Sequence, residues 1–191
     1  MRYIYLSSRM KISVLLPGAL FLLLVRCGAE TAFCAVAAVT VHELGHFAAG
    51  RLLGYRAESF TVGLSGADIR YSGVMSYKDD MLISLAGPFA SFAAAALSAS
   101  FFSRFSLYSL AYGALNILPV GVFDGGRALH ALLLLYLPFR AAERAFSAVS
   151  FSVLFLLYLT GVFVLLYTAF NASLFYVCVY AFAAAAGGEM I

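Results

Sequence analysis

The chain has 191 residues, of which 64% are hydrophobic and 11% are charged. Soluble domains contain about 45–50% apolar and about 25% charged residues, and a water-soluble globule of this size has too little interior to bury so much apolar surface. The composition also excludes disordered and disulfide-rich secreted chains, and the net charge of +3 includes no basic run of the kind that binds nucleic acid. An integral membrane protein remains, surrounded by the lipid bilayer.

Six apolar segments are expected to cross the membrane as the helices of an all-α bundle. A helical span needs about 20 predominantly apolar residues, and the first segment reaches that length only with its flanks. The fourth is too long for one straight helix, and Pro119, Gly125 and Gly126 interrupt it, so we expect one crossing with a broken middle. The six segments are Ile12–Val25, Ala29–Ala49, Met81–Phe102, Phe105–Phe139, Phe146–Phe170 and Ala172–Ala186.

The longest connection, Arg51–Asp80, carries the pattern of a β-hairpin between the second and third spans. Polar and apolar residues alternate over Ser59–Ser65, a turn signal follows at Ser65-Gly66, and a second short segment covers Asp68–Ser72. Alternation with a period of two on both sides of a turn is typical of paired strands. We therefore expect a small membrane-associated hairpin, which either offers its edge to an extended substrate or makes no substrate contact.

Lysine and arginine are concentrated in alternate connections, which predicts the orientation of the chain. The positive-inside rule places the connections that are richer in these residues in the cytosol. We expect a multi-pass protein with both termini in the cytosol and with residues 1–191 forming one membrane-embedded domain. The cytosolic side receives Arg2, Arg9, Lys11, Arg51, Arg56, Arg70, Lys78, Arg140 and Arg144, and the other side receives Arg26 and Arg104.

His42, Glu43 and His46 form the sequence H-E-x-x-H near the end of the second predicted span. Residues four apart share one face of a helix, so both imidazoles can bind one metal ion. Two histidines and one oxygen ligand leave a fourth position for water, as in a catalytic zinc site, and the adjacent glutamate can take a proton from that water. The alternative is a metal-free polar contact between helices, but an ionised glutamate inside a membrane is costly and favours a functional role.

A third zinc ligand is needed, and Asp124 is the best candidate because it interrupts an apolar stretch beside the helix-breaking Pro119. A helix N-cap is the other role open to Asp124. Asn116 is expected to act in catalysis by holding the substrate backbone or a developing oxyanion, with an interhelical hydrogen bond as the alternative. We interpret His130 as part of a packing or polar network rather than as a ligand.

These residues together resemble the site-2 protease family of intramembrane zinc metalloproteases. The resemblance lies in His42-Glu43-Leu44-Gly45-His46, in Asn116-x-x-Pro119-x-x-x-x-Asp124-Gly125 and in Ala86-Gly87-Pro88. The Asp124-Gly125-Gly126-Arg127 run and the lack of a PDZ insertion are most similar to the stage IV sporulation protein FB branch. Many members of that branch carry a CBS domain, which we do not expect in this chain. The resemblance implies a bacterial cell membrane protein in which His42, His46 and Asp124 bind one Zn²⁺ ion and Glu43 is the base.

The residues and the resemblance together predict a zinc-dependent intramembrane endopeptidase that cleaves a membrane-tethered or membrane-proximal protein. The sporulation branch implies a sigma-factor precursor as substrate, and the residues leave open whether regulatory membrane proteins also bind. Two other functional classes are alternatives: a membrane zinc transporter or scaffold, and an inactive partner of another membrane protein. The chain lacks the internal repeat and the polar pathway typical of a transporter, and a scaffold has no need of Glu43.

Overall fold

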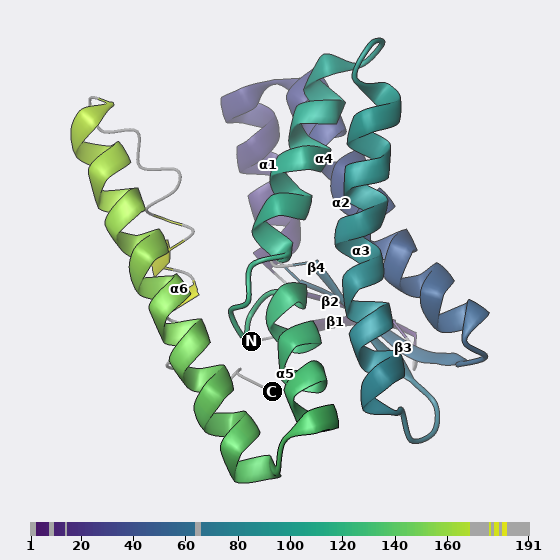
Figure 1. Ribbon diagram of the computed structural model, residues 1–191. Helices are drawn as coiled ribbons and strands as arrows, with labels where there is room; N and C mark the ends of the chain where they lie inside the picture. Colours follow the sequence, from purple (N-terminus) through teal and green to yellow (C-terminus); the bar gives the residue numbers. More distant parts are fainter. Residues whose placement is uncertain are drawn as a thin grey trace. The chain divides into compact units, whose positions relative to one another are not determined.

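The structure is a computed structural model, and it describes residues 3–7, 10–13, 15–63, 66–168, 176, 178–179 and 181–182. The chain folds into two compact units, Met1–Ala114 and Leu115–Ile191, which are described in turn. Helices dominate both units, and the first unit also contains a small sheet (Figure 1).

Two local sequence features, a glycine and a serine cap, set helix ends in the first unit. Gly28 separates the first two helices with a φ of 82°, a conformation that glycine adopts without a steric penalty. The third helix begins at a side-chain cap, because the hydroxyl of Ser76 accepts a hydrogen bond from the backbone N–H of Asp79 at 3.1 Å. These helices are α1 Leu15–Cys27, α2 Ala29–Leu52 and α3 Tyr77–Ser98, followed by α4 Ser103–Asn116, most of which belongs to this unit.

In the part of the chain that the structure describes, three helices are long and apolar enough to cross a membrane: α2, α3 and α6, which covers Phe139–Tyr167. They correspond to the second, third and fifth predicted spans. The helices α1, α4 and α5 (Asp124–Tyr136) contain 13, 14 and 13 residues, fewer than the about 20 that one span requires. Six full-length spans are therefore not confirmed among the described residues, and the sixth predicted span, Ala172–Ala186, lies mostly outside them.

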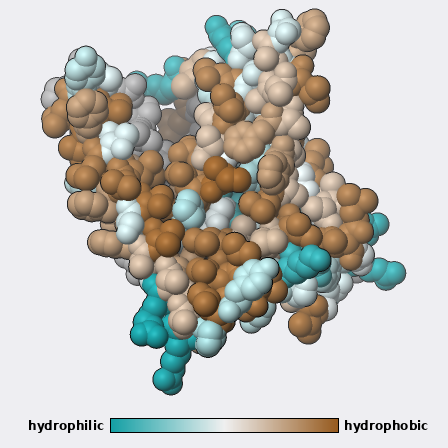
Figure 2. Space-filling view, viewed as in Figure 1, coloured by the Kyte–Doolittle hydropathy of each residue, from teal (hydrophilic) through white to brown (hydrophobic). Residues whose placement is uncertain are grey.

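Large apolar side chains are exposed on the long helices. Phe33 on α2, Phe89 on α3 and Phe163 on α6 are 75%, 59% and 63% exposed, and Figure 2 shows apolar side chains over most of the face that it draws. Contiguous apolar surface of this kind is rare on soluble monomers but contacts the acyl chains of a bilayer favourably. The surface therefore agrees with the composition in indicating a membrane protein.

The sheet has four strands in the order β1-β2-β3-β4. The predicted hairpin is confirmed as the antiparallel pair β3 (Ala57–Gly63) and β4 (Gly66–Tyr71), in which Phe60 lies opposite Ile69. The strand β2 runs parallel to β3 and antiparallel to β1, so the N-terminal segment extends the hairpin on one side. On the other side, β4 is the edge strand of the sheet.

The N-terminal strands show that the predicted start of the first helix is wrong. The first predicted segment begins at Ile12, whereas Ile12 lies in β2 (Met10–Ser13), opposite Val62 of β3, and α1 begins at Leu15. The strand β1 covers Tyr3–Ser7. Isoleucine and tyrosine favour strands, but the partner strand lies far along the chain, so no local pattern revealed the pairing.

The second unit contains the interruption that the sequence predicts in the fourth apolar segment. The helices α4 and α5 are separated by a short loop that packs directly against two glycines at the start of α5. A Cβ atom on Gly125 would overlap the carbonyl of Ile117, and one on Gly126 would overlap the carbonyl of Val120. Glycine is therefore required at both positions for the loop to lie against the first turn of α5.

Two sets of contacts stabilise the second unit. Val120 in the loop belongs to a small apolar core with Leu154 of α6 and Ala181. Between α5 and α6, Nε2 of His130 lies 2.6 Å from Oε1 of Glu143, which is the polar network expected for this histidine. Both sets of contacts fix α5, the helix that begins with the predicted ligand Asp124.

Candidate metal centre

The helix α2 brings His42 and His46 together as the H-E-x-x-H spacing predicts. Their ring centroids lie 4.9 Å apart, and a ring nitrogen of one lies within 4.8 Å of a ring nitrogen of the other. Both rings are buried, with exposed fractions of 1% for His42 and 9% for His46. Two imidazoles are therefore held side by side inside the protein, as a metal site requires.

The helix α3 orients both imidazoles through their Nδ1 atoms. Nδ1 of His46 lies 2.8 Å from the carbonyl oxygen of Ile83, and Nδ1 of His42 lies 2.9 Å from the hydroxyl of Ser91. Because a carbonyl only accepts, neutral His46 carries its proton on Nδ1 and keeps the lone pair on Nε2. Metal-ligating histidines commonly donate their second nitrogen in this way, which fixes the tautomer and the ring orientation.

Gly87 of α3 faces the Nε2 atoms of both histidines. It lies midway between Ile83 and Ser91 in sequence, and a Cβ atom there would overlap Nε2 of His46 and lie 2.7 Å from Nε2 of His42. The two potential ligand atoms therefore converge on the one position of this helix face that has no side chain. The glycine keeps the space beside the ligand atoms open.

A second glycine allows α2 and α3 to approach closely. A Cβ atom on Gly45, inside the H-E-x-x-H sequence, would lie 2.7 Å from the carbonyl oxygen of Ala86 and 2.7 Å from Cβ of Ala90. Small residues at such contacts let membrane helices pack backbone to backbone. The close approach of the two helices at Gly45 and Ala86 brings the Nδ1 partners on α3 within reach of the imidazoles.

Two tyrosines support the histidine pair, and neither was identified from the sequence. The ring of Tyr112 on α4 meets the ring of His42 edge to face, with centroids 4.7 Å apart. The hydroxyl of Tyr71 on β4 donates to the backbone carbonyl of His46 at 2.9 Å, and its ring packs against Gly50, where a Cβ atom would clash. These contacts come from distant parts of the sequence, and only the small residue at position 50 hinted at a close neighbour.

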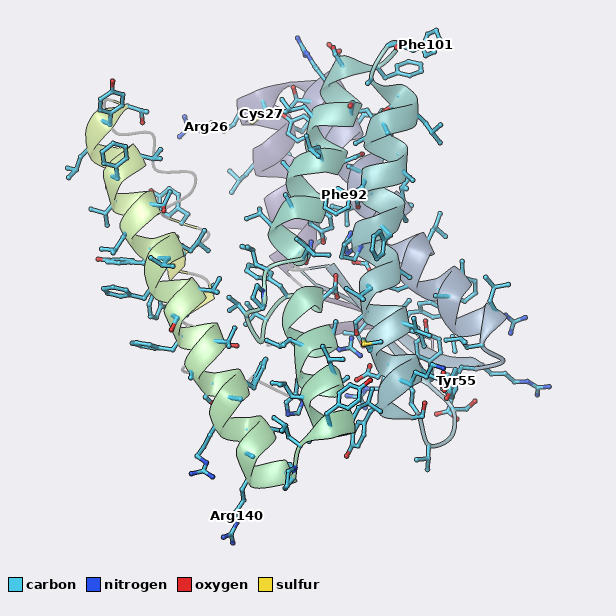
Figure 3. All side chains as sticks on the ribbon, viewed as in Figure 1. Arg26, Cys27, Tyr55, Phe92, Phe101 and Arg140 are labelled. Carbon is cyan, nitrogen blue, oxygen red and sulfur yellow. The ribbon has the colours of Figure 1, made fainter. Side chains whose placement is uncertain are left out.

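A third tyrosine fixes the connection that follows α2. The hydroxyl of Tyr55, labelled in Figure 3, donates to Oδ2 of Asp79 at 2.7 Å, and the hydroxyl of Ser76 donates to the same oxygen at 2.8 Å. The hydrogen bond to Asp79 raises the pKa of Tyr55, and desolvation adds to the shift. The phenol is therefore held neutral as a donor, and it links the loop after α2 to the start of α3.

Glu43, the predicted base, lies on α2 between the two histidines in sequence. Its carboxylate atom Oε2 is shielded from solvent, and the residue lines a cavity of about 250 Å³ together with apolar side chains. Thr40 precedes it on the same helix, and the Thr40 hydroxyl donates to the carbonyl of Val36 at 2.8 Å. Glu43 is therefore half-buried beside an apolar space, next to His42 on the same helix.

Asp124 and Asn116 belong to the second unit, and they are described within it. Asp124 is the first residue of α5, whereas the N-cap position falls to Phe123. The N-cap role that the sequence left open for Asp124 is therefore wrong, although a carboxylate in the first turn is still favoured by the helix dipole. Asn116 is the last residue of α4 and is 8% exposed.

The donor atoms fit a zinc ion. Two imidazole Nε2 atoms with occupied Nδ1 atoms are the usual histidine contribution to such a site, and a carboxylate such as that of Asp124 is the usual oxygen ligand. Among the described residues, the group of side chains that could hold a metal ion contains histidine and a carboxylate but no cysteine. A set of nitrogen and oxygen donors suits zinc better than a metal that prefers thiolates.

Comparison with known proteins identifies the fold. Among solved structures, a site-2 protease from Methanocaldococcus jannaschii superposes with a TM-score of 0.72, covering 100% of this chain and 95% of that chain at 18% sequence identity. This chain has the fold of a site-2 protease. The resemblance to the site-2 protease family that the motifs indicate is therefore confirmed in the fold.

A curated relative supports the branch of the family. Stage IV sporulation protein FB from Bacillus subtilis (strain 168) is 30% identical over 123 residues, which cover 58% of this chain and 43% of that protein. The chain thus matches less than half of the length of this relative. No family model matches the chain.

Proposed function

We propose that the chain is a zinc-dependent intramembrane endopeptidase that cleaves a membrane-tethered or membrane-proximal protein. The observation that carries the proposal is the convergence of Nε2 of His42 and His46 on Gly87, inside two helices long enough to span a membrane. The orientation of both rings by partners on α3 supports a ligand role over a polar contact between helices. The site-2 protease fold supports the same reaction class.

In this proposal His42, His46 and Asp124 hold one Zn²⁺ ion. A zinc ion bound there supplies Lewis acidity, which lowers the pKa of a coordinated water to near neutrality and polarises a peptide carbonyl. The residues of the chain orient the ligands, transfer the protons and bind the peptide.

Glu43 acts as the proton carrier. Its carboxylate accepts a proton from the attacking water and then gives it to the nitrogen of the leaving amine, so that one proton is taken up and returned in each cycle. The position of Glu43 supports this role, because it is half-buried and follows the proposed ligand His42 directly on α2. Asn116 donates its side-chain N–H to the substrate carbonyl oxygen, where negative charge develops.

The substrate must be extended when it is cut. A helical peptide hides its carbonyl groups in its own hydrogen bonds, so a membrane helix has to unwind at the cleavage site. The strand β4, at the end of the sheet, offers backbone groups to which an extended segment adds as a further strand. A sigma-factor precursor remains the proposed substrate class, by analogy with the sporulation relative, and regulatory membrane proteins remain a proposed second class of partner.

Replacement of Glu43 by glutamine tests the proposal. The Glu43→Gln variant keeps both histidines but cannot accept a proton, so we expect wild-type zinc content and no cleavage of a co-expressed tethered substrate. Zinc is measured by mass spectrometry of the purified protein, and cleavage by immunoblotting. Cleavage by this variant at the wild-type rate would overturn the role of Glu43, and zinc flux into liposomes by a wild-type protein that cuts nothing would favour a transporter.

A further inference from the structure

A cavity of about 250 Å³ opens beside Glu43, between α2 and the hairpin. The helix contributes one wall and the two strands β3 and β4 contribute the other. Phe47 of α2 and Phe60 of β3 contact each other where the two walls meet, with ring centroids 5.9 Å apart. The lining residues are Thr40, Glu43, Leu44, Phe47, Phe60 and Ile69.

The cavity is apolar except at Glu43. The Thr40 hydroxyl is engaged with the carbonyl of Val36 inside its own helix, so it offers little polarity to an occupant. An apolar cavity of roughly 150 Å³ lined by leucine, isoleucine and phenylalanine takes up benzene. A cavity of about 250 Å³ therefore has room for one side chain of the size of leucine, methionine or phenylalanine.

The walls of the cavity are fixed relative to the histidine pair. Tyr71, at the end of β4, donates to the carbonyl of His46 and packs on Gly50 of α2. The strand that supplies Ile69 is thus tied to the helix that supplies Glu43 and the two imidazoles. An occupant of the cavity is held at a constant distance from the proposed base, which is what a substrate subsite requires.

We propose that this cavity is a subsite that receives one bulky apolar side chain of the substrate, close to the bond that is cut. The inference rests on the proposed function, because Glu43 is at once the proposed base and part of the wall. Glu43 joins the cavity to the proposed machinery, so a peptide whose scissile bond reaches Glu43 brings a neighbouring side chain next to the cavity. The preferred substrates therefore carry a large apolar residue, rather than alanine or a polar residue, next to the cleaved bond.

Tryptophan fluorescence tests occupancy without relying on cleavage. The chain has no tryptophan, and Leu44 lines the cavity while being 55% exposed, so Leu44→Trp in a Glu43→Gln background places a single fluorophore at the rim of the cavity. Phe163→Trp on lipid-exposed α6 is the matched control. The probes are apolar peptides in which one 4-bromophenylalanine moves along the sequence, added to phosphatidylcholine vesicles with or without brominated acyl chains. We expect one register of peptide to quench Leu44→Trp saturably and to leave Phe163→Trp unchanged.

Brominated lipid tests whether a lipid acyl chain, rather than a peptide side chain, occupies the cavity. If the cavity receives a peptide side chain, bound peptide protects Leu44→Trp from quenching by brominated lipid. Quenching of Leu44→Trp by brominated lipid to the same extent with and without every peptide would show that an acyl chain fills the cavity, and it would overturn the proposal.

Substrate preference provides the second readout. Phe60→Ala enlarges the cavity and Ile69→Trp fills it, whereas Phe89→Ala on α3 removes an exposed ring elsewhere. We expect Ile69→Trp to lower the ratio of kcat/KM for a phenylalanine substrate over its alanine counterpart by about tenfold or more, and Phe89→Ala to leave the ratio unchanged. An unchanged ratio in Ile69→Trp, with both substrates slowed equally, would contradict the subsite. A wild-type protein that cuts neither substrate would instead count against the proposed function, while the quenching result still decides occupancy.

Discussion

At the scale of single residues, the candidate metal centre depends on Gly87, which has no side chain, as much as on its two histidines. The sequence predicted the pair His42 and His46 because spacing within one helix determines a shared face. It did not predict their partners Ile83 and Ser91, since periodicity within a helix does not say which other helix it meets. Once α3 is known to be the neighbour, the spacing of four that links Ile83, Gly87 and Ser91 explains both hydrogen bonds and the open space between them.

Gly87→Ala is the sharpest residue-level prediction. The added methyl group occupies the space on which both Nε2 atoms converge, so we expect the affinity for zinc to fall by more than tenfold while the helices still form. Titration with a competing zinc chelator measures the affinity, and circular dichroism reports the helices. Gly18→Ala is the matched control, because nothing lies within 4 Å of the position of its Cβ atom. Equal zinc affinities of the two variants would contradict this role of Gly87.

Ser91→Ala removes the partner of one imidazole only. Loss of a residue that orients a metal ligand typically reduces metal affinity by about 10–100-fold, and we expect a reduction in that range because His42 loses its fixed orientation. The same chelator titration measures it. Ser98→Ala, on the same helix, is the control, since the Ser98 hydroxyl bonds to the carbonyl of Ala94 within α3. A zinc affinity in Ser91→Ala that matches Ser98→Ala would exclude a role for the hydroxyl.

At the scale of elements, local chemistry predicted the hairpin and the break but not the full sheet. The β3–β4 hairpin followed from alternation around a turn, and the interruption before α5 followed from Pro119 and two glycines. The strands β1 and β2 were missed because β2 pairs with β3 across a long stretch of chain. The docking of the sheet on α2 through Tyr71 was missed for the same reason, since one aromatic residue in a strand has no distinct local pattern.

Tyr71→Phe tests how the sheet is attached to the metal-binding helix. The variant keeps the ring against Gly50 but loses the hydrogen bond to the carbonyl of His46. A net loss of about 1 kcal/mol in the free energy of unfolding is expected for one such bond. Unfolding in mixed detergent micelles measures it, with Tyr77→Phe as the control because Tyr77 is half exposed on α3. A loss no larger than in the control would mean that the bond contributes nothing to stability.

At the scale of the whole molecule, composition alone established a membrane protein, but the number of spans could not be derived from it. Apolar content does not distinguish a full span from a short helix. The helix α1 has only 13 residues, and the predicted fourth crossing is divided between α4 and α5. The first unit does contain one contact that bears on orientation. Arg104 at the start of α4 pairs with Glu30 at the start of α2 at 2.9 Å, so the two connections predicted to lie outside the cytosol meet at one end of that unit.

The predicted orientation can be tested by cysteine labelling in intact cells. Arg104→Cys and Arg140→Cys are introduced separately after Cys27, Cys34 and Cys178 have been replaced by alanine. The positive-inside rule predicts that a membrane-impermeant maleimide labels Arg104→Cys but not Arg140→Cys until the cells are opened. The reverse labelling would invert the proposed topology, and equal labelling of both would place the two positions on one side.

The central claim, that His42 and His46 bind a catalytic zinc ion together with Asp124, is tested most directly by metal analysis of the purified protein. We predict one zinc ion per chain, with nitrogen and oxygen ligands at about 2.0–2.1 Å in X-ray absorption spectra. The folded variants His42→Ala, His46→Ala and Asp124→Ala are expected to lose most of that zinc. A His42→Ala/His46→Ala double variant that retains the zinc content and the spectrum of the wild type would contradict the account.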